Sequence, residues 1–583
     1  MIPVQQIQNW MNINNKDILL INRTDEFLNE YIAPYAERLN WISSFSGSAG
    51  KAIIEKNKAY LFVDGRYTHQ AQEQVNTSLY EIKHLKDYWS HLTNYKYEKK
   101  IIACDGNLHS INEIEKIYKI FEDSEIVLEL LDENPIDLNW KNQSSKPKSD
   151  AFFHEMKYAG EESLNKIKKI QNQIQLTFVD YYILSSLDSI AWLLNIRGND
   201  IKFTPLMCSY VIIPKEGKID LFVDKIKIQS IQKELESLVN IHAVKYISKY
   251  IKNLDIKKVV GMDKKDTPFC FKKICSDNGL TVNYLKNPCL YPKAIKNSAE
   301  LDGARQANLR DGVSMSRFIF WLKKKIQIDE IDEIKAANYL YNLRKKNELF
   351  YSLSFDTISA FGPNASYPHY RVTSKSNLSF KNNSIYLVDS GAQYKDGTTD
   401  ITRTIVFGQP SKEQKDRFTR VLKGHIAISE SKFIFNTKGS QLDPLARKYL
   451  NEIGCDYDHG TGHGIGSFLS VHEGPQSIAK SQDKSDGFIK EGMILSNEPG
   501  YYKTGEYGIR IENLIICCLK KSGKLYFETI SWAPIDRDLI DVSLLCETEI
   551  KWINEYHQKV YDKISPNLLI EESDWLYLVT RPL

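Results

Sequence analysis

The sequence lacks several features that would point to a membrane, a nucleic acid or the extracellular space. Its 77 basic and 74 acidic side chains leave a net charge of only +3 over 583 residues, which gives no electrostatic reason to expect nucleic acid or an anionic membrane as a partner. The apolar run at 514–519 is far shorter than the roughly 18 residues of a membrane span. The first residues have no basic start followed by an apolar core, so we expect no secretory signal.

Cysteine is also scarce, with nine residues, an odd number, and no regular spacing. Such a set is typical of reduced thiols in a cytosolic protein rather than of a disulfide framework. With 42% hydrophobic and 26% charged residues, the chain has enough apolar side chains for several packed cores. At about 150 residues per domain, its length predicts three or four domains. We therefore expect a large, cytoplasmic, multidomain protein.

An internal repeat indicates two related domains at the start of the chain. The run LFVD occurs at 61–64 and again at 221–224, and KKIIACD at 99–105 is matched by KKVVGMD at 257–263. The two offsets, 160 and 158 residues, are nearly equal. Each LFVD closes a pair of β-rich runs around a short polar turn, as in a hairpin. We therefore predict two tandem α/β domains.

We place the domain boundaries in polar segments without periodicity. The first linker is 134–150, and a helix with Leu164, Ile167, Ile170 and Ile174 on one face is expected after it. The predicted parts are 1–140, 150–292, 293–530 and 531–583.

Two helices in the second half are predicted from local signals. Asn297 and Glu300 have the spacing of a capping box, which opens a long helix through residue 326. A helical pattern at 547–564 lies in the C-terminal part.

A pair of aspartates is the first group that could carry chemistry. Asp389 alternates with apolar residues in a strand-like run and so shares a face with core positions. Asp400 follows 11 residues later, beyond a turn at 395–397, and is expected opposite Asp389 on a paired strand, about 5 Å away between Cβ atoms. Two carboxylates at so short a distance destabilise the fold unless they share a proton or bind a cation. Asp396, within the turn, is expected to face water.

A glycine-rich segment, HGTGHGIG, provides the second group. His459 and His463 are four residues apart, but the glycines between and after them make a helix improbable. In an extended chain, the even spacing still places both histidines on one side. The segment is not a zinc-protease HExxH, because residue 460 is Gly, and it lacks the G-K-[ST] ending of a phosphate loop.

The third group consists of two glutamates and an arginine near the end of the same region. Glu498 precedes Pro499 at the end of an apolar run, so an extended conformation is expected there. Arg510 and Glu512 are two apart in a strand-like run and point to one face. A surface salt bridge is the simpler interpretation, but the apolar setting favours a buried, partnered role.

Four carboxylates and one imidazole therefore stand out: Asp389, Asp400, His463, Glu498 and Glu512. Oxygen-dominated ligation suits two divalent cations of the Mn, Co, Fe or Zn kind. A thiolate site is not expected, because adjacent Cys517 and Cys518 point to opposite faces. A two-metal centre makes hydroxide from bound water and polarises a carbonyl or phosphoryl oxygen, which predicts a hydrolase.

These residues, in this order, resemble the signature of the pita-bread metallopeptidases (M24), the family of methionine aminopeptidase, prolidase, aminopeptidase P and metal-free creatinase. The resemblance implies creatinase-like α/β domains at 1–140 and 150–292, an α+β pita-bread catalytic domain at 293–530, and a C-terminal extension packed on it at 531–583. It implies that Asp389 binds one metal, that His463 and Glu498 bind the other, and that Asp400 and Glu512 bridge both.

The two N-terminal domains narrow the resemblance to the long three-domain form of aminopeptidase P. GSAGKAII, LFVDGRYTHQA and a nearly complete K-N-x-x-E-L-x-G-x-R-x-A motif beginning at Lys296 are similar to segments of that form. The resemblance implies a cytoplasmic homodimer that hydrolyses the N-terminal Xaa-Pro bond of peptides through a dimetal-bridged hydroxide. Mn²⁺ is the expected metal, with Co²⁺, Zn²⁺ or Fe²⁺ as alternatives, and no nucleic acid or membrane partner is expected.

The same resemblance implies roles for residues that do not bind metal. His369, His459 and His472 resemble the histidines that hold and polarise the substrate. His472 and His369 would donate to the developing oxyanion, and Glu498 would carry the proton to the leaving proline nitrogen. Arg510 would orient Glu512 and its neighbours.

Two alternatives remain open from the sequence. A prolidase, which cuts only Xaa-Pro dipeptides, shares the ligands but usually has one N-terminal domain. A non-catalytic binding protein of the same fold would lack metals, whereas the ligand set here is complete.

Overall fold

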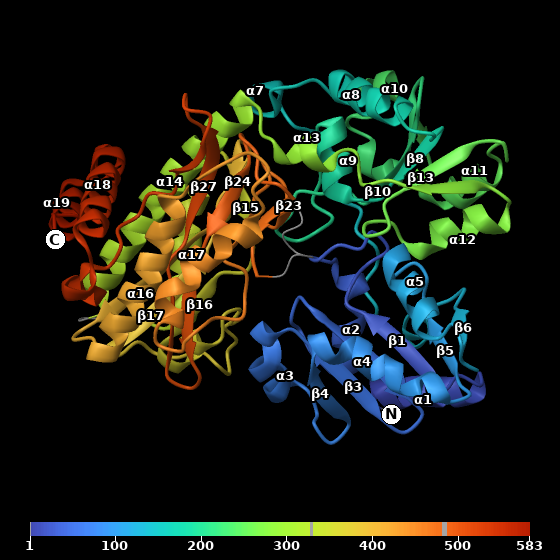
Figure 1. The fold of residues 1–583 in the computed structure, drawn as a ribbon, viewed down its shortest axis with the longest axis horizontal. Helices are drawn as coiled ribbons and strands as arrows, with labels where there is room; N and C mark the ends of the chain where they lie inside the picture. The colour runs from blue at the N-terminus through green and yellow to red at the C-terminus, as the bar shows by residue number, and fades with distance from the viewer. Residues whose placement is uncertain (1, 327–329, 481–486) are drawn as a thin grey trace. The chain divides into compact units, whose positions relative to one another are not determined.

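The computed structural model describes residues 2–326, 330–480 and 487–583, which form two compact units (Figure 1). Unit 1 comprises Met1–His154 and Glu161–Leu290, and unit 2 comprises Glu155–Gly160 and Tyr291–Leu583. Within the described ranges, no helix combines the length and apolar character that crossing a bilayer requires. All nine cysteines are free thiols, as expected.

Unit 1 contains two six-stranded sheets, drawn in blue and in cyan to green in Figure 1. The first is, in spatial order, β4 (Tyr80–His84), β3 (Ala59–Val63), β2 (Gly50–Glu55), β1 (Ile18–Asn22), β5 (Ile101–Cys104) and β6 (Val127–Leu130). The second is β12 (Val239–His242), β11 (Ile219–Val223), β10 (Ser209–Pro214), β8 (Tyr181–Leu184), β13 (Val259–Met262) and β14 (Thr281–Tyr284). The strand orders are equivalent, which confirms the prediction of two tandem α/β domains.

Both predicted hairpins are confirmed. In the first domain β2 pairs antiparallel with β3, with Ile53 opposite Tyr60. In the second, β10 pairs antiparallel with β11, with Val211 opposite Leu221.

The helix predicted after the first linker has one wrong core position. In α8 (Ser163–Gln175), Ile167, Ile170 and Ile174 are buried, but Leu164 is 45% exposed. Lys166 is buried on the inner face, where its ammonium donates to Trp192 O and Asn195 Oδ1. A long lysine thus fills a position that periodicity assigns to an apolar residue, because backbone and amide oxygens lie opposite it.

The predicted linker 134–150 begins too early. It contains a short helix, α6 (Pro135–Asn139), whose first turn is capped by the Asn134 side chain. Ile136 is buried in the core of the first domain, and Trp140 stacks on Trp41 with ring centroids 6.0 Å apart. Residues 134–140 therefore belong to the packed first domain, since two apolar side chains outweigh the polar composition of the segment.

Equivalent loops of the two domains pair with each other in unit 1. The loop at 106–112, after β5, faces the loop at 264–270, after β13, and Ser110 forms a bridge with Pro268. Four backbone bonds flank this bridge: Asn112 N to Lys264 O, Cys270 N to Gly106 O, Ile111 N to Thr267 O, and Phe269 N to His109 O. Shifting each residue by the repeat offset of 158 converts every bond into another of the four. The loops therefore pair reciprocally, as two-fold related segments do.

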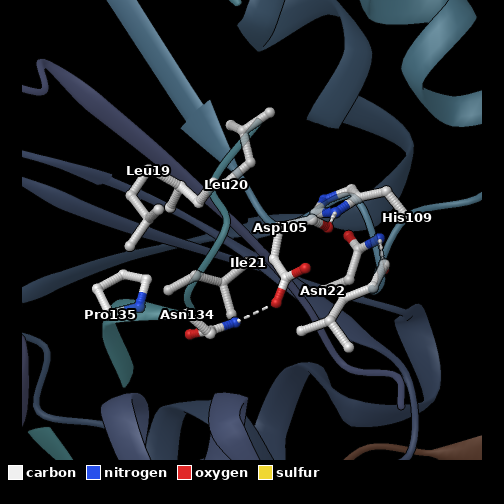
Figure 2. Close-up of a pocket in the computed structure, with 10 residues that line it drawn as sticks. Leu19, Leu20, Ile21, Asn22, Asp105, His109, Asn134 and Pro135 are labelled. Carbon is white, nitrogen blue, oxygen red and sulfur yellow. Dashed lines mark hydrogen bonds between the residues drawn. The ribbon is translucent and has the colours of Figure 1, made fainter. Parts of the chain in front are cut away.

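A small cavity lies at the carboxyl ends of β1 and β5 (Figure 2). Its polar lining is Asn22, Asp105, His109 and Asn134, and Asn134 Nδ2 donates to Asp105 Oδ2 over 3.0 Å. His109 Nδ1 lies 2.9 Å from Asp105 O, while its buried Nε2 has no hydrogen-bond partner in the described part of the chain. None of the residues that we predict for catalysis lines this cavity.

In unit 2, the predicted capping box is present. Asn297 and Glu300 bond reciprocally at the start of α14 (Ser298–Lys325), which ends one residue before the predicted limit. Met315, Phe318 and Leu322 pack this helix, with α15 (Glu333–Lys345), against one face of a three-stranded sheet. That sheet is β16 (Ile358–Phe361), β17 (Ser384–Ser390) and β20 (Ile401–Phe407).

A second sheet of unit 2 has six strands. In spatial order it is β21 (Lys432–Phe433), β28 (Leu525–Thr529), β27 (Asn513–Leu519), β24 (Ile494–Asn497), β22 (Gly462–Gly464) and β23 (Glu473–Ile478). Ile428 of α16 (Lys412–Ser429) and Ala446 of α17 (Gly439–Asn451) share a core with Leu495 and Ile515 of this sheet.

The C-terminal part ends in α18 (Glu547–Ile564), which has the predicted limits, and α19 (Ile570–Val579). Arg403 of β20 connects this part to the sheets by hydrogen bonds, and the Arg403 side chain is fully buried. The guanidinium donates to Tyr556 Oη over 2.7 Å, to Ala533 O over 2.9 Å and to Glu512 O over 2.8 Å. The extension therefore packs directly behind strands that carry predicted ligands.

Candidate metal centre

Asp389 and Asp400 lie on one antiparallel hairpin. Asp389 is in β17, and Asp400 immediately precedes β20. The prediction that they face each other is wrong, because Asp389 lies opposite Thr402. Tyr394 pairs with Gly397, so the turn is centred one residue later than a direct pairing of Asp389 with Asp400 requires. The two carboxylates are diagonal neighbours, which still lie on one face of the hairpin.

The prediction that Asp396 faces water is also wrong. Its side chain is buried and forms an ion pair with Arg310 of α14. A Cβ atom on Gly303 would lie 2.2 Å from Asp396 O, so α14 approaches the turn closely and covers it. The residues of the turn do not indicate that a helix roughly 90 residues upstream packs against it, so the burial of Asp396 could not be predicted from them.

His463 lies in β22, within an extended chain as predicted. Its Nδ1 is 3.1 Å from Gly464 O, and because a carbonyl only accepts, Nδ1 carries the proton. Nε2, the nitrogen available to a metal, lies 3.5 Å from Asp400 Oδ2 and 3.5 Å from Glu498 Oε1. An imidazole nitrogen placed between two carboxylates, with the other nitrogen on a backbone carbonyl, is the arrangement of a metal ligand.

Three elements bring the ligand atoms together. One ligand atom each from Asp400, His463 and Glu512 lies within 4.8 Å of the other two. In the described ranges, the buried oxygens Asp389 Oδ1, Asp400 Oδ1 and Glu512 Oε1 have no hydrogen-bond partner. Buried polar atoms normally have partners, and divalent cations are the partners that oxygen-rich sites select. The donor set therefore fits divalent metal ions.

The electrostatics of the cluster favour the same conclusion. Burial, followed by repulsion from Glu512, Asp389 and Glu498, raises the pKa of Asp400 well above its usual value. Burial and the charges of Glu498 and Asp389 likewise raise the pKa of Glu512. Cations among these groups would favour their ionised forms.

Arg510 bonds to one predicted ligand directly and to another indirectly. Its Nη2 donates to Asp389 Oδ2 over 2.6 Å, and its Nε donates to Thr402 Oγ1 over 3.2 Å. Thr402 Oγ1 in turn donates to Glu512 Oε2 over 2.7 Å. The resemblance implies that Arg510 orients Glu512 and its neighbours. Arg510 donates directly to Asp389 and reaches Glu512 through Thr402.

Tyr502 was not identified from the sequence. It lies in β25 (Gly500–Lys503), and its hydroxyl accepts from Arg510 Nη1 over 2.6 Å and lies 2.8 Å from His459 Nε2. Since His459 Nδ1 donates to Gly460 O over 2.8 Å, the hydroxyl proton of Tyr502 points to Nε2. Tyr502 therefore links Arg510 to His459, a predicted substrate histidine. Nothing in the sequence distinguishes Tyr502 from the adjacent Tyr501, so this role could not be predicted.

The other two predicted substrate histidines are half-buried. The His472 ring packs edge-on against His463, with centroids 4.4 Å apart. His369 lies just after η7 (Gly362–Ser366), and its neighbour Tyr370 packs in a cluster that includes Tyr502. The loop that carries His369 thus shares a contact with the Tyr502 network.

Four family models together match most of the chain. Residues 302–517 match the model of metallopeptidase family M24, and 523–583 match that of the C-terminal region of peptidase M24. Residues 3–128 and 142–300 each match a creatinase/prolidase N-terminal domain.

Individual relatives match over nearly their full length. A probable Xaa-Pro aminopeptidase P of Paracoccidioides brasiliensis (strain Pb03) is 36% identical, over 99% of this chain and 98% of the relative. The Xaa-Pro aminopeptidase 1 of Dictyostelium discoideum is 35% identical, over 100% and 96%.

Solved structures agree with these sequence matches. The X-prolyl aminopeptidase of Caenorhabditis elegans, described as a cytosolic enzyme with a di-nuclear active site, has a TM-score of 0.92 at 31% identity, over 97% of this chain and 95% of that one. An Xaa-Pro dipeptidase of Bacillus anthracis, at 24% identity and a TM-score of 0.52, covers 64% of this chain and 99% of its own. It shares the fold.

Proposed function

Because this chain belongs to metallopeptidase family M24, and its long relatives match it end to end, we propose that it is a metal-dependent Xaa-Pro aminopeptidase. It has the fold of that family, with two creatinase-like α/β domains before a pita-bread catalytic domain. The reaction is hydrolysis of the first peptide bond of a substrate whose second residue is proline. One observation carries the proposal: buried carboxylate oxygens without partners converge with His463 Nε2.

We propose the metal ligands that the resemblance implies: Asp389 would hold one ion, His463 and Glu498 would hold the other, and Asp400 and Glu512 would hold both. The closeness of Asp400, His463, Glu498 and Glu512 supports this set. Asp389 is included because its ion pair with Arg510 uses Oδ2 and leaves Oδ1 available to bind a metal. Two divalent ions held by these residues would supply an activated water near neutral pH and polarise the scissile carbonyl.

The chain's own residues would complete the chemistry. Glu498, half-buried beside His463, is placed to take a proton and to return it to the leaving proline nitrogen. His472 and His369 donate to the oxygen on which charge develops. His459, oriented by Tyr502, binds the substrate.

Domain number discriminates between this function and that of a prolidase. We propose the division 1–140, 150–292, 293–530 and 531–583. A solved dipeptidase covers only 64% of this chain, whereas the long aminopeptidase covers 97%. The additional N-terminal domain therefore favours longer peptides. The complete ligand set likewise argues against a non-catalytic binding protein.

The finer properties are part of the same proposal. We propose Mn²⁺ as the metal, because the oxygen-rich donor set with one imidazole suits it, with Co²⁺, Zn²⁺ or Fe²⁺ as substitutes. We propose a cytoplasmic homodimer, in keeping with nine free thiols. Metal analysis after purification without chelators, and light scattering, test the metal and the dimer.

The deciding experiment compares two substrates with the purified, Mn²⁺-loaded protein. Release of the first amino acid from an Xaa-Pro-Pro tripeptide, faster than from an Xaa-Pro dipeptide, is the expected result. Cleavage of the dipeptide alone would replace the aminopeptidase with a prolidase. No cleavage of either, with no metal retained after incubation with Mn²⁺, would favour a binding protein.

A further inference from the structure

Two lysines and a glutamate form a buried ionic group in unit 2. Lys293 Nζ donates to Glu473 Oε2 over 2.8 Å, and Lys296 Nζ donates to Glu473 Oε1. The side chains of Lys293 and Glu473 are fully buried, and that of Lys296 is 1% exposed. Lys296 Nζ also donates to Lys293 O over 2.7 Å, which fixes the two lysines relative to each other. Lys296 is the first residue of the K-N-x-x-E-L motif, for which the proposed mechanism has no role.

Glu473 is the immediate neighbour of His472, and the sheet alone does not fix its position. In the pairing of β22 with β23, Gly462 lies opposite Ile478 and His463 opposite Ser477. The register then jumps, so that Gly464 lies opposite Glu473. Three residues, 474–476, are thus looped out between the regular ladder and Glu473. An additional anchor beyond the irregularity is therefore required to hold His472 beside His463.

Stability alone does not explain the ionic group. A buried ion pair is often no more stable than apolar side chains of similar volume. Two lysines on one carboxylate hold it from two directions, as a positioning device requires.

We propose that Lys293 and Lys296 are positioning residues that fix Glu473 and, through it, the ring of His472 against the metal ligand His463. The lysines act on the backbone that carries His472 and do not touch the substrate. This inference rests on the proposed function for its kinetic consequence, but its structural consequence is independent of it.

The test uses Lys293→Met and Lys296→Met, each in the full-length, Mn²⁺-loaded protein. Each variant leaves one lysine paired with Glu473, so the carboxylate keeps a cationic partner and folding should be retained. We expect kcat on an Xaa-Pro-Pro peptide to fall about 10- to 100-fold, the effect of a displacement near 1 Å in an active site. KM should change less than about twofold, and the metal content should not change. Lys412→Met, at an exposed position of α16, is the matched control and should behave as the wild type.

Crystal structures of the two variants test whether the lysines hold the His472 ring in place. The His472 ring should leave its contact with His463, whose centroid separation is 4.4 Å in the wild type, while Asp400 and Glu512 keep their places. An unmoved ring overturns the inference, as does unchanged kcat in a variant of an active wild type. Loss of metal together with activity also overturns it, because the lysines would then hold the fold rather than His472.

Lys296→Gln covers the case in which the methionine variants do not fold. The amide can still donate to Glu473 but removes the charge attraction, while Lys293 keeps the carboxylate paired, so the same ring displacement is expected and an unmoved ring again overturns the inference. If the wild type cleaves no Xaa-Pro peptide, the proposed function fails, while the ring positions still decide this inference.

Discussion

At the scale of single residues, the metal centre depends on oxygens that the protein alone does not satisfy. Asp400 illustrates this, because its carboxylate is buried, one oxygen has no partner among the described residues, and its pKa is raised by burial and by neighbouring carboxylates. A residue so placed is costly to the fold unless a cation binds it. Removing its charge should therefore affect metal binding before it affects folding.

Asp400→Asn should reduce the rate on an Xaa-Pro-Pro peptide by at least about 100-fold, because the loss of residues that merely orient metal ligands already costs 10- to 100-fold. Bound metal, measured by atomic emission, should fall below two ions per chain. Asp538→Asn, at an exposed position, is the control. Full activity of Asp400→Asn would rule out the proposed bridging ligand.

Tyr502→Phe removes the hydroxyl that joins Arg510 to His459. A hydrogen bond to a charged group contributes about 1.5–3 kcal/mol, so kcat/KM should fall about 10- to 100-fold with both metals retained. Tyr501→Phe, the adjacent residue on the opposite face of β25, should have little effect. Equal rates for the two variants would contradict a role for the Tyr502 hydroxyl.

The sequence allowed the candidate ligands to be chosen, but not how they are supported. Asp389 and Glu498 are recognisable because carboxylates end or interrupt apolar strands, a local pattern. Thr402 and Tyr502 act only because strands distant in sequence become neighbours, and nothing local distinguishes them from other threonines and tyrosines. The diagonal placement of the two aspartates depends on where the turn closes, because moving its centre by one residue changes the partner of Asp389 from Asp400 to Thr402.

At the scale of elements, the loop that carries His369 is held by one buried carboxylate at the start of α15. Glu333 Oε1 accepts from Phe361 N over 2.7 Å, and Oε2 accepts from Tyr370 Oη over 2.9 Å and from Leu378 N over 3.0 Å. The three donors span the loop from end to end, so Glu333 fixes its shape.

Glu333→Gln keeps the size of this side chain but replaces one acceptor with a donor. Unsatisfied buried groups cost about 1–3 kcal/mol each, so we expect a lower melting temperature and a kcat/KM reduced about tenfold. Glu348→Gln, exposed just after the same helix, controls for the loss of one charge. If activity were unchanged while stability fell, the loop would not depend on Glu333 for its catalytic shape.

The C-terminal extension should detach more easily in acid. Burial, and then the charges of Arg537 and Arg403, lower the pKa of His557 in α18 to about 3, and its Nε2 accepts from Ile535 N over 3.1 Å. Below about pH 6.5 the unfolded chain takes up a proton that the native imidazole resists. Stability is therefore lost as the pH falls from about 6.5 towards 3, by about 1.4 kcal/mol per pH unit.

His557→Gln cannot titrate, and its amide oxygen can still accept from Ile535 N. Between pH 6.5 and 5, the unfolding free energy of this variant, measured with urea, should fall less steeply than that of the wild type. The two slopes should differ by about 1.4 kcal/mol per pH unit, which is the contribution of one proton. The metal site titrates equally in both proteins and cancels in the comparison. Parallel pH curves would show that His557 does not govern acid sensitivity.

Elements with strong local signals were predictable. The capping box of α14 and the limits of α18 follow from side chains that bond within one turn. Leu164 and the start of the predicted linker at 134 were misplaced, although the predicted first domain, 1–140, includes 134–140. Their environments come from other elements: oxygens opposite Lys166, and Trp41 opposite Trp140.

At the scale of the whole molecule, the two units should respond differently to chelation. Only unit 2 contains the proposed metal ligands, and ligand at 1,000 times its Kd stabilises a folded unit by about 4 kcal/mol. Calorimetry with a chelator should lower one unfolding transition by several degrees and leave the other in place. A uniform shift of both transitions would place metal-dependent stability throughout the chain.

The architecture was predictable to the extent that repeats reveal it. Two short matched runs, LFVD and the KK–D segments, sufficed to predict two similar sheets, because each marks an equivalent strand. The reciprocal pairing of loops 106–112 and 264–270 was not predictable, since it consists of backbone bonds that leave no mark on side-chain identity.

That pairing has a consequence for how unit 1 behaves on dilution. A two-fold interface between separate subunits dissociates as the protein concentration falls. Here both halves belong to one chain, joined through the segment after residue 140, so each loop meets its counterpart at an effective concentration set by the tether, which is in the millimolar range for short linkers. The interface should therefore remain closed at any protein concentration, and only cleavage of the tether would make it reversible.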